Sequence, residues 1–261
     1  LNAVAVEANR RTFAWGRLAA HDIDAVRAAA QPTMREDKPA AEKLEDIVAK
    51  RVELLTAYQD AAYAERYRKT IEEVAKAERE KARGRTGLAE AAARSLAKLM
   101  AYKDEYEVAR LYTDGEFQKK LAAQFDGDYK LTFHLAPPLF ARRDPETGQL
   151  IKREFGPWAF SAFKLLARMK GLRGGAFDLF GRTAERRMER QLIVDFEATL
   201  RELASKLDPQ NHPIAVEIAK LPETMRGFGH VKEKNVALAK QREANLLARF
   251  RSPEVRAQAA E

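Results

Sequence analysis

The sequence predicts a mainly helical protein, a multi-helix domain with one long amphipathic helix and a small β-hairpin insertion. Apolar residues recur at three-, four- and seven-residue steps over most of the chain, which is typical of helices that bury one face. Only near residue 130 does the period change to two, the spacing of a half-buried strand. With 261 residues the chain can bury a large core, so its fold needs no disulfide or metal.

Residues 1–22 are expected to form one helix, because Val4, Trp15 and Leu18 lie at helical intervals. A polar linker is expected over residues 23–38. The helical domain proper is then assigned to residues 39–252, and the tail at residues 253–261 is expected to fray.

Two helices are expected in the first part of this domain. Pro39 suits the first turn of a helix, and the apolar series over residues 44–74 predicts one long amphipathic helix that ends near Gly84. Thr86 is the expected N-cap of the next helix, which should continue to about Thr113.

A hairpin is expected near residues 129–155, after a short helix that ends at Phe125. The alternation over residues 130–135 predicts a strand with one apolar face (Leu131, Phe133, Leu135) and one polar face (Lys130, Thr132, His134). The turn sequence at residues 144–148 should join residues 139–142 to residues 150–155.

Helix is expected again from Pro157 onward. Its apolar stripe should be buried, and comprises Trp158, Phe160, Phe163, Leu166 and Met169. A long helix is expected from Thr183 to Leu207, where Asp208-Pro209 ends it, followed by helices over residues 214–221 and 230–250.

The charge pattern does not favour nucleic acid as a partner. The chain has 47 Lys and Arg against 39 Asp and Glu, a net charge of +8, and the two signs alternate as on a solvated surface with many ion pairs. A nucleic-acid binder gathers its cations on one face. A basic helical nucleic-acid-binding protein therefore remains only an alternative hypothesis.

Features that the sequence lacks indicate the cellular compartment of the protein. There is no cysteine, no run of about 18 apolar residues and no secretory leader, so a cytoplasmic protein that does not cross a membrane is expected. Because the chain begins at Leu1 inside a helical pattern, it is expected to be a piece of a longer polypeptide.

No catalytic or metal site is expected. The four histidines lack any metal-ligand spacing, and a catalytic motif is missing as well. The carboxylates Asp104, Glu105 and Glu107 lie among basic residues, so ion pairs explain them better than acid–base chemistry.

Two basic groups are candidate contacts for an anion or a partner. Arg142, Arg143, Lys152 and Arg153 could converge across the hairpin and meet a phosphate or an acidic protein, or could simply protect a sheet edge by charge.

The second group lies in the string Arg226-Gly-Phe-Gly-His230-Val-Lys232 at the start of a helix. Arg226, His230 and Lys232 could hold an anion there together with backbone N–H groups. A tight turn between packed helices is the favoured alternative.

Several long strings of the chain resemble one enzyme family. They are YKDEYEVARLYTDGEF, YKLTFHLAPPLFARRDPETGQLIKREFGPW, MKGLRGGAFDLFGRTAERRMER and LPETMRGFGHVKEKN. They resemble the C-terminal region of the fused bacterial indolepyruvate:ferredoxin oxidoreductases, which belong to the 2-oxoacid:acceptor oxidoreductases. The first string, LNAVAVEANRRTFAWGR, resembles the closing helix of the gamma-type domain of that family, so residues 1–22 are assigned to it.

The resemblance implies oxidative decarboxylation of an aryl 2-oxoacid to its acyl-coenzyme A, with thiamine diphosphate, magnesium and iron–sulfur clusters, and with ferredoxin as electron acceptor. None of these cofactors has its ligands here: there is no Gly-Asp-Gly followed by a paired Asn, and no cysteine. The resemblance thus implies that this chain contains no catalytic, cofactor or metal residue, and that catalysis lies in another part.

The implied role is a scaffold or interaction region of the parent oxidoreductase, which is expected to be a homo-oligomer. A docking module for acidic ferredoxin or for the phosphates of coenzyme A is the alternative.

Overall fold

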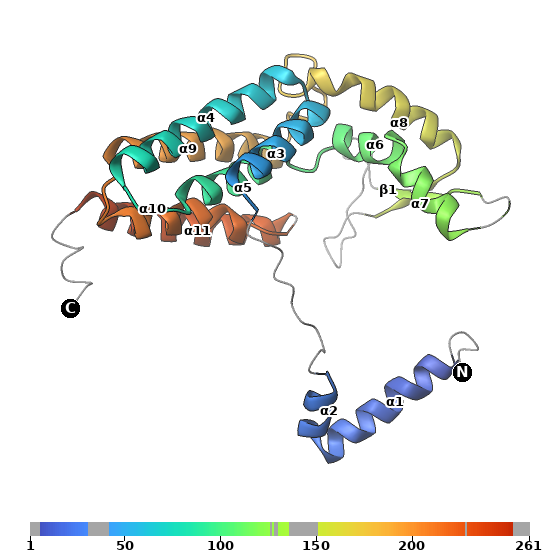
Figure 1. Ribbon diagram of the computed structural model, residues 1–261. Coiled ribbons are helices and arrows are strands. Elements are labelled where there is room, and N and C mark those ends of the chain that lie inside the picture. The colour runs from blue at the N-terminus through green and yellow to red at the C-terminus, as the bar shows by residue number, and fades with distance from the viewer. Residues whose placement is uncertain are drawn as a thin grey trace. The chain divides into compact units, whose positions relative to one another are not determined.

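The structure is a computed structural model that describes residues 6–30, 42–125, 127, 130–135, 151–227 and 229–252. The chain divides into two compact units, residues 1–43 and residues 44–261. Each unit is described by itself (Figure 1).

The first unit contains two helices, α1 (Val6–His21) and α2 (Ile23–Ala30). The linker expected over residues 23–38 therefore begins with a helix. Helix α2 forms for local reasons. The Asp22 carboxylate accepts hydrogen bonds from the backbone N–H of Asp24 (3.1 Å) and of Ala25 (2.9 Å), and an alanine-rich stretch follows. No residue of α1 is buried.

The second unit is built around a helical bundle. It consists of α3 (Leu44–Tyr58), α4 (Ala61–Lys81), α5 (Leu88–Met100), α9 (Ala184–Lys206), α10 (His212–Lys220) and α11 (His230–Arg251). Helix α5 is its central element, because it packs against α3, α4, α9 and α10 (Figure 1). Its many alanines let these neighbours approach closely. The largest fully buried side chains include Tyr67, Ile71, Leu88, Leu96, Met100, Leu200, Leu203 and Phe250.

The expectation of one long helix over residues 39–84 is wrong, because α3 and α4 are separate helices that pack against each other. The break lies at Asp60, whose extended backbone (φ −162°, ψ 177°) and side chain begin α4: the carboxylate accepts a hydrogen bond from the Tyr63 N–H at 2.8 Å. The mainly helical fold with a small hairpin is nevertheless confirmed.

The continuous helix expected over residues 86–113 is also wrong. It is divided into α5 and α6 (Glu105–Thr113), and Asp104 is the N-cap of α6 through a 2.8 Å bond from the Glu107 N–H. The expected cap Thr86 is replaced by a distant carboxylate. Glu78 accepts hydrogen bonds from the first N–H groups of α5, those of Leu88 (2.7 Å) and Ala89 (3.0 Å).

A smaller layer adjoins the bundle. It contains α6, α7 (Glu116–Gln124), β1 (Phe133–Leu135), β2 (Arg153–Phe155), α8 (Trp158–Arg168) and the 3-10 helix η1 (Met169–Leu172). The two strands pair antiparallel, with Phe133 opposite Phe155. An aromatic cluster of Tyr112, Phe117, Phe133 and Phe163 holds this layer, with neighbouring ring centroids 4.9–5.3 Å apart.

The hairpin confirms the expected alternation, since Phe133 is buried and His134 is exposed. Residues 153–155 pair with residues 133–135, whereas the expected arm at residues 139–142 lies outside the described residues. The stripe on α8 is only half-buried, and Trp158 stays 64% exposed. Trp158 begins the helix, and its ring lies 5.8 Å from the Phe155 ring between centroids.

The C-terminal helices follow the expectation closely. Thr183 caps α9, which ends at Lys206, and α11 begins at His230. A 3-10 helix, η2 (Leu221–Thr224), connects α10 to the segment before α11. Along the described part of the chain, no helix combines the length and the apolar character that spanning a membrane requires.

Candidate functional site

A buried ion pair lies where the bundle meets the smaller layer. Arg173 follows η1, and its guanidinium binds both oxygens of Asp104, with 2.5 Å from Nε to Oδ2 and 2.9 Å from Nη2 to Oδ1. Its Nη1 donates to the carbonyl of Tyr58 at 2.6 Å, and the guanidinium carbon lies 3.7 Å from the centre of the Tyr58 ring. Arg173 thereby ties together the end of α3, the start of α6 and the loop before α9.

The tyrosines around this pair act as neutral hydrogen-bond donors. Burial raises the pKa of Tyr58, and its hydroxyl donates to the Tyr102 carbonyl at 2.9 Å. Burial, with Asp178 next in importance, raises the pKa of Tyr106 to about 12, and its hydroxyl donates to Asp178 at 3.2 Å. Groups that hold their protons this firmly are structural and do not act as bases near neutral pH.

Asp178 organises the loop between η1 and α9. Its carboxylate accepts hydrogen bonds from the N–H groups of Gly174 (2.7 Å) and Gly181 (2.9 Å). A Cβ at Gly181 would lie 2.2 Å from Oδ2 of Asp178, so any larger residue there must displace this carboxylate.

A second ionic group lies on α9. Glu189 is 4% exposed and accepts hydrogen bonds from Arg186 Nη1 (2.6 Å) and from Lys232 Nζ. Arg186 also pairs with Glu105, at 3.5 Å, and burial raises the pKa of that carboxyl group. Asp104 pairs with Arg173 and Glu107 pairs with Arg110. The expected ion pairing of Asp104, Glu105 and Glu107 is therefore confirmed.

A small pocket adjoins this group, and we call it the Lys98 pocket. It is lined by Lys98, Leu99, Tyr102, Glu189, Leu192, Met225 and Lys232, and has a volume of about 40 Å³. Lys98 Nζ donates to the carbonyls of Pro222 (2.7 Å) and Glu223 (3.0 Å). Burial, and then the nearby charge of Arg226, lowers the pKa of Lys98.

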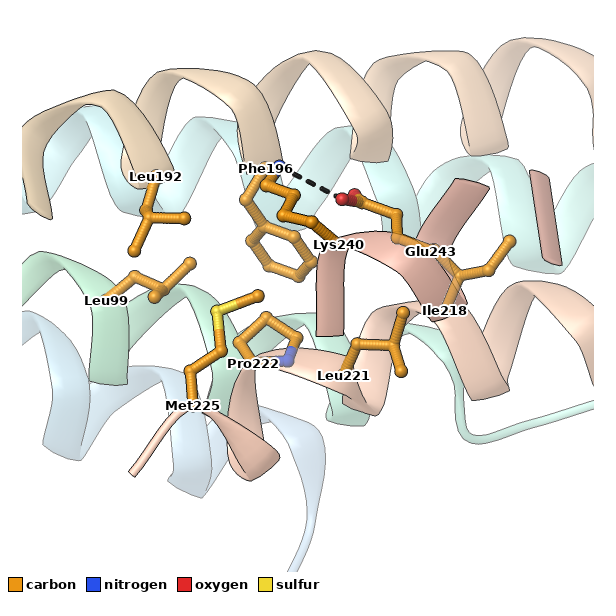
Figure 2. A pocket seen from close by; sticks show the side chains of 9 residues that line it. All are labelled: Leu99, Leu192, Phe196, Ile218, Leu221, Pro222, Met225, Lys240 and Glu243. Atoms are coloured by element: carbon orange, nitrogen blue, oxygen red, sulfur yellow. Dashed lines mark ion pairs between the residues drawn. The ribbon is translucent and has the colours of Figure 1, made fainter. Parts of the chain in front are cut away.

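Figure 2 shows a second cavity between α5, α9, α10, η2 and α11, with apolar side chains pointing into it. The cavity has a volume of about 10 Å³, which is room for about one water molecule. Its charged residues pair with each other, Lys240 Nζ to Glu243 Oε2 at 2.9 Å. Thr199 donates to the other oxygen of Glu243 at 3.0 Å, so this cavity presents no unsatisfied group of that pair to a ligand.

The sequence-predicted basic residues lie in two places. Lys152 and Arg153 are exposed at β2, whereas Arg142 and Arg143 lie outside the described residues. Convergence of these four side chains therefore stays a prediction.

The other predicted anion contacts, Arg226, His230 and Lys232, differ in their surroundings. Arg226 and His230 are exposed, with Arg226 Nε donating to the Glu223 carbonyl at 2.8 Å, while Lys232 pairs with Glu189. Gly227 has φ +105°, and a Cβ there would lie 2.8 Å from Val231 Cγ1. This glycine therefore makes a tight turn between packed elements, as the favoured alternative predicts.

Two functional candidates, Arg173 and Lys98, escaped the sequence reasoning. Arg173 lies among glycines that indicate only a helix stop, and Lys98 lies in a helix that also contains the charged residues Glu90 and Arg94. No sequence signal marks them, because Lys98 is exposed like an ordinary helical lysine and the acceptors of Arg173 lie far away in sequence.

The comparisons with known proteins identify a family. A model described as "Family of unknown function (DUF6537)" matches residues 44–245. The chain belongs to this family. No curated protein and no solved structure matches it.

The DUF6537 match begins at the first residue of α3 and ends within α11. The DUF6537 region therefore includes the Arg173–Asp104 pair, the Asp178 loop and the Lys98 pocket. Among its described residues, and those of the first unit, no three His, Asp or Glu side chains are grouped as a metal site would need.

Proposed function

We propose that this chain is the scaffold and interaction region of a thiamine-diphosphate- and iron–sulfur-dependent 2-oxoacid ferredoxin oxidoreductase of the indolepyruvate type. The assignment of the enzyme depends on the resemblance of the strings quoted above. In this proposal, catalysis takes place in another part of the same enzyme, and that part is the principal partner of this chain. The enzyme is proposed to be a cytoplasmic homo-oligomer.

The observation that carries the interaction role is the apolar surface of α1 that the first unit does not cover by itself. Phe13 is 69% exposed and Trp15 is 49% exposed, and no residue of this 16-residue helix is buried. An isolated helix of this length is marginal in water, and most helices are stabilised by packing an apolar face. Helix α1 therefore needs a surface outside the first unit, and in the proposal that surface is the gamma-type domain that α1 closes.

The second unit supports a scaffold role. Several of its buried charges are paired, among them Asp104 with Arg173 and Glu189 with Arg186, and its buried tyrosines are held as neutral donors. The chain has no cysteine, so it offers no thiolate for an iron–sulfur cluster, and these cofactors do not fit its residues. No step of the proposed reaction is assigned to this chain.

The test uses the complete reading frame that encodes this chain. The purified product is expected to contain thiamine diphosphate, iron and acid-labile sulfide, and to reduce ferredoxin when indolepyruvate and coenzyme A are added. The double variant Phe13→Glu/Trp15→Glu is expected to weaken subunit or domain association in that enzyme, measured by analytical ultracentrifugation and limited proteolysis. The matched control Thr12→Glu places one new charge on the same helix. A complete product without these cofactors contradicts the proposal.

A second candidate function is docking of acidic ferredoxin or of coenzyme A phosphates. The exposure of Lys152 and Arg153 favours it, since exposed cations steer acidic partners and give salt-dependent association. In the complete enzyme, Lys152→Glu/Arg153→Glu is expected to raise the KM for ferredoxin or coenzyme A without lowering kcat. Unchanged kinetics and an unchanged response to salt count against docking at β2.

A further inference from the structure

Helix α8 presents an apolar stripe to solvent. Trp158 is 64% exposed and Leu165 is 62% exposed, and Ala162 between them is exposed as well. The three residues follow one another at steps of four and three, so they lie on one face of the helix. A different face of α8, which includes the buried residue Ala159, packs against α6 (Figure 1). An apolar stripe with this spacing is typical of a helix that packs against a second helix.

The stripe is complementary to itself when two copies of α8 lie antiparallel. Ala162 is about midway between Trp158 and Leu165, so Trp158 of one copy then meets Leu165 of the other at each end of the contact. The two copies of Ala162 lie next to the two-fold axis, where their small side chains let the helices approach closely. A two-fold interface uses the same surface of both subunits in this way.

The charges at the two ends of α8 fit the same arrangement. Arg168 is the last residue of α8 and is exposed, whereas the exposed Glu154 lies in β2, shortly before α8 begins. An antiparallel second copy brings its Glu154 to the end of α8 where Arg168 lies, and a parallel copy brings like charges together. A second copy of the chain therefore supplies both the apolar surface and the opposite charge.

The length of α8 limits the strength of such a contact. Its 11 residues form a helix about 16 Å long. A pair of helices of this length buries less than the roughly 800 Å² per partner of a standard interface. The contact is therefore expected to be weak, with a dissociation constant on the order of 100 μM.

We propose that α8 is a self-association surface, through which two copies of the chain pair antiparallel by Trp158, Ala162 and Leu165. This inference does not rest on the proposed function, because it concerns only the contact of one 261-residue chain with another.

Sedimentation equilibrium of the 261-residue chain, at about 5 to 500 μM, tests the association. A reversible monomer–dimer equilibrium is expected for the wild type. Leu165→Glu is expected to raise the dissociation constant about tenfold or more, because the contact would bury its charge. Leu238→Glu makes the same change at a 56% exposed position of α11 and should leave the equilibrium unchanged.

Two results of this measurement overturn the proposal. One is a wild-type chain that stays monomeric over the whole range. The other is a dimer that persists in folded Leu165→Glu, including a dimer that only Phe13→Glu/Trp15→Glu dissociates, since that result assigns the contact to α1.

A cross-link tests the antiparallel geometry. The chain has no cysteine, so one introduced thiol reports on its own position. Ala162→Cys is expected to give a disulfide-linked dimer with copper phenanthroline in air, because two Cα atoms next to the axis can reach the roughly 4.4–6.8 Å that a disulfide needs. Lys164→Cys, exposed on another side of the same helix, should cross-link about tenfold more slowly or less. Equal rates for the two variants overturn the proposed pairing.

Discussion

The guanidinium of Arg173 and the carboxylate of Asp104 form a two-bonded ion pair inside the protein, with both side chains less than 5% exposed. The two residues are 69 positions apart in sequence, and Arg173 also reaches the bundle through its 2.6 Å hydrogen bond to the Tyr58 carbonyl at the end of α3. A buried pair of this kind is held by mutual neutralisation, so the loss of one partner leaves a charge without compensation.

Asp104→Asn is therefore expected to lower the free energy of unfolding by about 3 kcal/mol. Asparagine is also a good N-cap, so α6 keeps its first turn and the loss reports the uncompensated Arg173. Urea unfolding followed by circular dichroism measures the change. Glu116→Gln breaks the exposed pair with Lys119 and should leave the urea midpoint unchanged. Equal effects of the two substitutions would contradict the structural role of the buried pair.

Gly181→Ala is expected to destabilise the protein by about 2 kcal/mol, because the new methyl group would lie 2.2 Å from Oδ2 of Asp178. Gly171→Ala is the control, since a Cβ at Gly171 meets no atom within 4 Å. Thermal unfolding of the two variants should separate them by several degrees. Coinciding melting temperatures would mean that the Asp178 loop is not held as described.

Ala92→Leu tests the central position of α5. Ala92 is fully buried, so a larger side chain must push neighbouring helices apart, and the expected loss is about 3 kcal/mol of unfolding free energy. Ala62→Leu places the same side chain on an exposed position of α4 and should be nearly neutral in chemical denaturation. A tolerated Ala92→Leu would argue against tight packing around α5.

Stability is expected to fall in acid partly through Glu202. Hydrogen bonds from Arg251, and then from Lys206, lower its pKa to about 2 in the folded protein. The folded pKa lies below the unfolded value of about 4.3, so this stabilisation is present above the unfolded value and is lost as the pH falls toward 2.

The corresponding variant is Glu202→Gln. Its urea midpoint should decline less between about pH 6 and pH 3 than that of the wild type, by an amount worth less than about 1 kcal/mol because the pair is largely solvated. Parallel pH profiles for the two proteins would assign the acid sensitivity to other carboxylates.

Local signals explain the elements that the sequence predicted well. Thr183 precedes α9 with the chemistry of an N-cap, Asp208-Pro209 follows its end, and His230 begins α11 after two glycines. The alternation around Phe133 predicts β1 for the same reason, because a half-buried strand leaves its period in the sequence.

The helix breaks at Asp60 and Asp104 were missed because apolar periodicity continues on both sides of each residue. An aspartate in such a pattern is compatible with an exposed helical position or with an N-cap, and only tertiary packing decides between them. Arg173 lies 69 positions from Asp104, and Glu78 lies 134 positions from His212, whose Nε2 is 2.7 Å from Glu78 Oε1, so no local pattern could place these side chains.

The proposed scaffold role is tested by measuring 2-oxoacid-dependent reduction of ferredoxin by two proteins. One is the protein that the complete reading frame encodes, and the other is the 261-residue chain alone. Both are supplied with thiamine diphosphate, magnesium and coenzyme A. The account predicts turnover by the complete protein, lowered by Phe13→Glu/Trp15→Glu, and none by the chain alone. Turnover by the isolated chain, or a complete protein that lacks this activity, would contradict it.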